Sequence, residues 1–174
     1  TVTPAAEIVR LAHAKGVPVL FDGCQAAVHA SVDVRALDCD FYVFCAHKLY
    51  GPSGIGALYA KAEHLAAMRP YQGGGDMIRE VGFDAITYAD PPHRFEAGTP
   101  PIVEGVGWKA AFDYLAGLDR DGAHAHEQAL LARATENLSA LNWVKIYGTA
   151  PGKGAIVAFD VEGVHAHDLA TIID

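Results

Sequence analysis

The sequence lacks long apolar segments, clusters of basic residues and closely spaced cysteine pairs. No apolar run approaches the roughly 18–20 residues that cross a bilayer, and the first residues lack the basic and apolar regions of a secretory signal. The 13 lysines and arginines are dispersed among 21 acidic residues, giving a net charge of -8, so no basic stripe can follow a phosphate backbone. We therefore expect a soluble protein whose partners include neither nucleic acid nor a membrane.

The few cysteines and the histidine pairs indicate neither a disulfide framework nor a metal site. Cys24, Cys39 and Cys45 form no Cys-x-x-Cys spacing, which fits a reducing cytoplasm, and we expect each to be a small buried side chain. Two histidine pairs, 124/126 and 165/167, fall in helical or helix-start patterns, where side chains two residues apart diverge. We expect these histidines to be solvated and to bind no metal.

Apolar periodicity predicts an α/β fold for the first part of the chain. Residues 4–15 have the spacing of an amphipathic helix that stops at Gly16. Two short apolar runs, 17–21 and 41–45, are typical of strands buried on both faces of a parallel sheet. The residues between these runs suffice for a crossover connection.

The second part of the chain predicts a different unit. Long helices are expected at 102–118 and 124–141, followed by strands at 143–147 and 155–160. This order indicates a large domain over 1–118 and a linking helix with the start of a small α+β domain over 119–174. Because Thr1 is not an initiator Met and the last residues read as a helix just beginning, we interpret the chain as a fragment.

Polar groups follow both buried strands at the edge where ligands bind in open α/β sheets. Asp22 ends the first strand, and Lys48 follows the second, ahead of a Gly-Pro-Ser-Gly-Ile-Gly loop. Enzymes that use pyridoxal 5'-phosphate (PLP) need a lysine amine to form a Schiff base with the cofactor and an acid to keep its ring nitrogen protonated. A surface lysine and an aspartate in an ordinary turn would fit the spacing equally well.

Three motifs, in order, carry a resemblance to a known family. They are Phe21-Asp22-Gly23-Cys24-Gln25-Ala26, then Ala46-His47-Lys48-Leu49-Tyr50-Gly51-Pro52-Ser53-Gly54-Ile55-Gly56, and then Arg94-Phe95-Glu96-Ala97-Gly98-Thr99-Pro100. With them, the chain resembles the Suf-type cysteine desulfurase/selenocysteine lyase family of class V aminotransferases. The resemblance implies the large domain of fold-type I PLP enzymes, a mostly parallel sheet with flanking helices, followed by the start of the small C-terminal domain.

The resemblance also implies roles for particular residues. Lys48 would hold PLP and move the substrate Cα proton, while Asp22 would pair with the pyridine nitrogen. Gln25 would hydrogen-bond the phenolic oxygen and His47 would lie by the phosphate. Thr99 would donate to the phosphate bound in the partner subunit of a homodimer.

One residue departs from the family pattern. Where the family has Ser or Thr to donate a hydroxyl to the phosphate, this chain has Cys45, a weaker donor. One interpretation is that a backbone N–H and His47 are sufficient to bind the phosphate. The alternative is that the protein is a scaffold module that has lost PLP.

The implied reaction is removal of sulfur from L-cysteine as an enzyme persulfide, with release of alanine, for iron-sulfur cluster assembly. The sulfur would pass to an acceptor protein. Selenocysteine lyase acting on L-selenocysteine, an epimerase and a kynureninase-like enzyme remain alternatives. The sulfur-accepting cysteine and the substrate-binding arginine are expected beyond Asp174, so the fragment alone should not complete the reaction.

Overall fold

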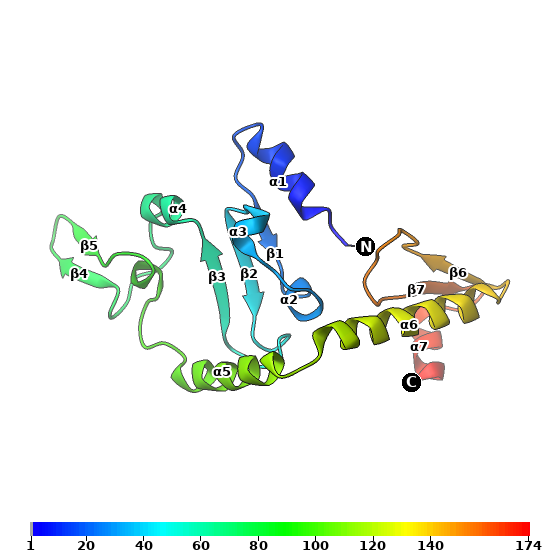
Figure 1. Ribbon diagram of the computed structural model, residues 1–174. Coiled ribbons are helices and arrows are strands. Elements are labelled where there is room, and N and C mark those ends of the chain that lie inside the picture. Colours follow the sequence, from blue (N-terminus) through cyan, green and yellow to red (C-terminus); the bar gives the residue numbers. More distant parts are fainter. Residues whose placement is uncertain (1) are drawn as a thin grey trace. The chain divides into compact units, whose positions relative to one another are not determined.

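The computed structural model describes residues 2–174 and divides them into two compact units, one over residues 5–117 and one dominated by residues 118–174 (Figure 1). The larger unit contains, in order, α1 (Ala5–His13), β1 (Leu20–Asp22), α2 (Ala26–His29), α3 (Val34–Leu37), β2 (Phe41–Cys45), β3 (Gly56–Ala60), α4 (Ala62–Ala67), β4 (Ile78–Val81), β5 (Ile86–Tyr88), the 3-10 helix η1 (His93–Phe95) and α5 (Ile102–Ala116).

The central sheet has the order β1-β2-β3, and β1 and β2 are parallel, as the sequence predicts. Phe21 pairs with Tyr42 and Asp22 with Val43. Strand β3 returns antiparallel to β2, through the loop that carries Lys48. Both parallel strands therefore finish at the same edge of the sheet.

The prediction that both parallel strands are buried on both faces is wrong for β1. Leu20 is 56% exposed, whereas Tyr42 in the middle of β2 is 5% exposed. The difference follows from position, because β1 lies at an edge of the sheet and β2 has a neighbour on each side.

The first hydrophobic cluster joins α1 to this sheet. Val9 from α1 packs with Val19, Cys39 and Tyr42, all under 9% exposed. Removing such side chains from water stabilises the fold by about 1.5–3 kcal/mol each. The turn that follows α1 closes at Gly16, whose φ of 68° favours a residue without a Cβ.

The second cluster supports the Lys48 loop. Trp108 and Ala111 of α5 pack against Ala46, which is fully buried directly after β2. The Trp108 and Phe44 rings lie 5.4 Å apart, and a Cβ on Gly51 would come within 2.8 Å of the Trp108 ring. Helix α5 thus fixes the backbone from which Lys48 projects.

A polar network closes the other end of β2. Asp40 is 5% exposed; its Oδ2 accepts the Val19 N–H at 2.7 Å and lies 2.8 Å from His13 Nε2. Its Oδ1 lies 3.0 Å from His64 Nε2 and 3.3 Å from Lys61 Nζ. Burial opposes ionisation, but the contacts from His13, the Val19 N–H, His64 and Lys61 outweigh it and hold the pKa of Asp40 well below its usual range. The network ties α1, β1 and α4 to the start of β2.

The second unit has its own elements: α6 (Arg120–Ser139), β6 (Val144–Tyr147), β7 (Ala158–Val161) and α7 (Ala166–Ile173). Strands β6 and β7 form an antiparallel pair, with α6 against β6 and α7 against β7. The Asp119 side chain caps α6 by accepting the Gly122 N–H at 2.9 Å. Within residues 2–174, no helix combines the length and apolarity needed to cross a membrane.

Candidate active site

The site begins where β1 and β2 finish together. The Gly23 N–H donates to the Val43 carbonyl at 2.8 Å, which extends the parallel pairing one residue past Asp22. A Cβ on Gly23 would lie 1.9 Å from the Tyr42 ring, so only glycine allows this close approach. The exposed Asp22 carboxylate is consequently set at the strand end, with the exposed Gln25 immediately before α2.

Lys48 lies on a tight loop between β2 and β3. The Ala46 carbonyl accepts the N–H groups of Leu49 at 2.7 Å and Gly51 at 2.9 Å, and the Ala46 N–H donates to the Ile55 carbonyl at 3.1 Å. Tyr50 has a φ of 59°, a left-handed conformation uncommon outside glycine. Buried Ala46 and Leu49 anchor the loop, while Lys48 between them is exposed.

The surroundings of Asp22 favour the ionised form of its carboxyl group. The Cys24 backbone N–H donates to Asp22 Oδ1 at 3.0 Å. This bond, followed by one from the Cys24 thiol, lowers the pKa of Asp22 against a smaller opposing effect of burial, and the charge of Lys48 lowers it further. Asp22 is therefore ionised at neutral pH and within electrostatic reach of Lys48.

Two of the three cysteines belong to this strand edge, which the sequence did not predict. Cys39 is fully buried as expected, but Cys24 and Cys45 are partly exposed, so the prediction of a buried side chain is wrong for both. The Cys45 thiol lies 3.7 Å from Nε2 of His47. A hydrogen bond to Asp22, burial, and interaction with Cys45 raise the pKa of Cys24 to about 11. The signal that could have predicted this is the strand pairing, because Cys24 and Cys45 each lie two positions after the paired residues Asp22 and Val43.

The loop that carries Thr99 is anchored mainly by backbone contacts. The Gly98 N–H donates to the Gly75 carbonyl at 2.9 Å, and Gly98 has a φ of 82°. The Arg94 guanidinium donates to the carbonyls of Ala89 and Ala66, at 3.1 and 3.2 Å. Thr99 follows on an exposed stretch ahead of α5 and is not brought to Lys48 by any contact among residues 2–174.

Comparison with known proteins fits this arrangement. The profile of the aminotransferase class-V family matches residues 1–174. The chain belongs to the class-V aminotransferase family. A cysteine desulfurase from Dickeya dadantii is 51% identical over the whole chain. The crystal structure of the cysteine desulfurase CsdA from Escherichia coli superposes with a TM-score of 0.92 at 40% identity, covering 99% of this chain and 43% of that one.

The match identifies both the architecture and the cofactor of the family. Class-V aminotransferases are PLP enzymes. The structural neighbours show that the mixed α/β unit described above has the fold of part of a fold-type I enzyme. A variant of C-DES with glycine covalently linked to its PLP superposes with a TM-score of 0.78 at 27% identity, covering 97% of this chain and 46% of that one. The chain spans 42% of the length of the Dickeya relative.

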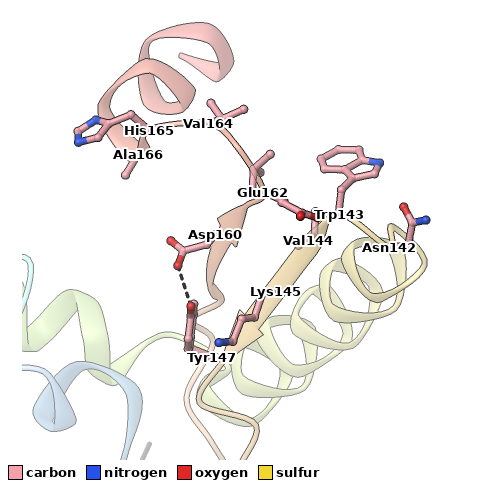
Figure 2. A pocket seen from close by; sticks show the side chains of 11 residues that line it. Asn142, Trp143, Val144, Lys145, Tyr147, Asp160, Glu162, Val164, His165 and Ala166 are labelled. Atoms are coloured by element: carbon pink, nitrogen blue, oxygen red, sulfur yellow. Dashed lines mark hydrogen bonds between the residues drawn. The ribbon is translucent and has the colours of Figure 1, made fainter.

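A hollow lies in the smaller unit. It is lined by residues of β6, β7 and the start of α7, and the Tyr147 hydroxyl donates to Asp160 at 2.7 Å across its strands (Figure 2). Beside it, His165 caps α7 by accepting the His167 N–H at 3.2 Å, so this pair lies at a helix start as predicted. No group of side chains suited to a metal ion occurs within residues 2–174.

Proposed function

We propose that the full-length protein is a PLP-dependent cysteine desulfurase that removes sulfur from L-cysteine as an enzyme persulfide and releases alanine. The observation that carries this proposal is the placement of Lys48 and Asp22 at the edge where two adjacent parallel strands finish, with the charge of Lys48 acting on Asp22. The choice of L-cysteine as substrate is supported by relatives that are cysteine desulfurases, one of which is 51% identical across this whole segment. We further propose that the sulfur passes to an acceptor protein for iron-sulfur cluster assembly.

The donor set of this strand edge fits PLP. An ionised carboxylate, Asp22, suits a protonated ring nitrogen, and its N–H bond from Cys24 keeps it charged. The Lys48 amine is exposed and makes no hydrogen bond or ion pair with any residue between 2 and 174. Gln25 and His47 supply further polar groups, and both side chains are exposed.

In this proposal each side chain has a separate task. When bound, PLP supplies an electron sink for the carbanion formed at the substrate Cα. Lys48 would hold the cofactor, and its amine would accept the Cα proton. Asp22 would keep the proton on the ring nitrogen, Gln25 would donate to the phenolic oxygen, and His47 would bind the phosphate.

The Cys45 position bears on phosphate binding. A thiol donates a weaker hydrogen bond than the hydroxyl that the family has there. Backbone N–H groups of the Lys48 loop and the His47 ring would then carry more of the phosphate affinity. Cys45→Ser is expected to tighten PLP binding severalfold, because it restores the stronger donor.

We also propose a two-fold homodimer in which Thr99 donates to the phosphate of the partner subunit. Helix α5 follows Thr99 directly and exposes Ile102, Val103 and Val106 at 63%, 80% and 69%. Exposed apolar side chains grouped on one helix are typical of an interface. A cytoplasmic location completes the proposal, in keeping with three unpaired cysteines.

The decisive experiment replaces Lys48 with alanine in the full-length protein. The wild type should show an absorbance band at ~400–430 nm and release alanine from L-cysteine, and the variant should lose the band and at least ~100-fold in rate. Lys15→Ala, which removes an exposed lysine after α1, is the matched control. A band that survives in Lys48→Ala contradicts the site, whereas turnover of L-selenocysteine or kynurenine without L-cysteine contradicts only the substrate.

A further inference from the structure

Two thiols follow the paired ends of β1 and β2 at the candidate active site. Asp22 pairs with Val43, the Gly23 N–H donates to the Val43 carbonyl, and the chain then turns out of the ladder as the Gly23 carbonyl accepts the Ala27 N–H. Cys24 and Cys45 each follow the pair Asp22–Val43 by two positions. Paired strands lie ~4.8 Å apart, so residues just past their ends begin within the ~4.4–6.8 Å that a disulfide spans between Cα atoms.

The side chains of this pair already interact. The Cys45 thiol contributes to the raised pKa of the Cys24 thiol, as neighbouring groups do, and Cys45 also lies 3.7 Å from His47 Nε2. Both are partly exposed, so a small oxidant can reach them, whereas Cys39 is fully buried. The proposed function assigns no role to the Cys24 thiol.

We propose that Cys24 and Cys45 form a reversible disulfide that modifies the cofactor site. His47 takes the Cys45 proton, and the sulfur attacks one oxygen of hydrogen peroxide, breaking the O–O bond and releasing water as a sulfenic acid forms. The Cys24 sulfur then attacks the Cys45 sulfur and forms the S–S bond as the S–O bond of the sulfenic acid breaks. The hydroxide released from Cys45 takes the Cys24 proton and leaves as a second water. Two thiols lose two electrons to the peroxide, and a dithiol reductant returns them.

Cys45 is the attacking thiol in this sequence. The hydrogen bond to Asp22 keeps Cys24 protonated at neutral pH, while Cys45 has an imidazole beside it to receive its proton. Cys24 therefore acts as the resolving thiol.

The consequence for the cofactor rests on the proposed function. Closing the bond takes the Cys24 thiol from Asp22 and the Cys45 thiol from His47, two residues assigned to PLP. Losing one hydrogen bond to a charged group corresponds to roughly tenfold in affinity, so oxidised protein should bind PLP about tenfold more weakly.

The experiment maps the bond in the full-length protein carrying Cys39→Ala. Trypsin places Cys24 in peptide 16–35 but Cys39 and Cys45 together in 36–48, so removing Cys39 makes the assignment unique. After peroxide treatment and alkylation of free thiols, the two peptides should appear joined, two hydrogens lighter than their sum, and separate on reduction. Cys24→Ala and Cys45→Ser should each abolish the joined species. Free, fully alkylated Cys24 and Cys45 after peroxide overturn the proposal.

PLP titration of reduced and oxidised protein separates the two proposals. A joined peptide in protein that never binds PLP leaves the disulfide standing and refutes the proposed function. PLP binding without a joined peptide refutes the disulfide alone. A joined peptide with unchanged PLP affinity supports the bond and refutes its effect on the cofactor.

Discussion

Replacing Asp40 with asparagine should destabilise the larger unit by about 2–3 kcal/mol. Asparagine has nearly the same shape and can still accept the Val19 N–H, so the change removes the charge and little packing. The hydrogen bonds that weaken are those with His13 at 2.8 Å and His64 at 3.0 Å. Hydrogen bonds to a charged group each contribute about 1.5–3 kcal/mol, so two would contribute about 3–6 kcal/mol; because both histidine side chains are about 30% exposed, solvent screening lowers the combined loss to about 2–3 kcal/mol.

The pH dependence gives this prediction a sign. The pKa of Asp40 is lowered in the folded protein, so the unfolded chain binds more protons in acid. The stability that Asp40 contributes is therefore complete above about pH 5 and is lost as the pH falls through ~4 toward the folded pKa. The difference between wild type and Asp40→Asn should shrink over that acidic range.

Urea unfolding of the full-length protein at several pH values measures this effect. With a typical slope of ~1–3 kcal/mol per molar urea, the midpoint should fall by about 1 M at pH 7. Asp38→Asn is the matched control, because Asp38 bonds the same Lys61 at 2.6 Å but is 63% exposed. Its effect should be much smaller. Equal midpoints for wild type and Asp40→Asn, or a difference unaffected by acid, would refute the reasoning.

Two further substitutions test the packing around the site. Met77→Ala removes a fully buried side chain just before the β4–β5 hairpin and should lower the free energy of unfolding by about 2–5 kcal/mol. Amide exchange in residues 78–88 should become faster. The control is Met68→Ala, which should lower the free energy of unfolding by less because Met68 is 37% exposed. Gly23→Ala drives a Cβ into the Tyr42 ring and should lower the melting temperature and weaken PLP binding as Asp22 shifts, whereas Gly73→Ala, with nothing within 4 Å, should do neither. A Gly23→Ala protein with unchanged melting and PLP affinity would contradict the close packing described here.

Much of the candidate site could be predicted because its signals are local. Each apolar run ends in polar residues at a fixed point of the chain, and parallel strands bring such points to one edge. The helices at 102–116 and 120–139 also agree with the sequence prediction, to within four residues at each end. The β4–β5 hairpin has only weak strand signals, since its few exposed residues bury little apolar surface.

The order of elements, and the position of Asp22 and Lys48 after two neighbouring strands, follow from the amino-acid sequence alone because both depend on short-range spacing; the resemblance of the motifs around them gave the pair its expected chemical role. Which side chains meet depends instead on the three-dimensional packing. Cys24 and Cys45 are far apart along the chain and approach each other because β1 and β2 end side by side, and Asp40 becomes a buried junction because α1 and α4 bring His13 and His64 to it. Such meetings arise from how elements pack, and no spacing rule along a single chain encodes that arrangement.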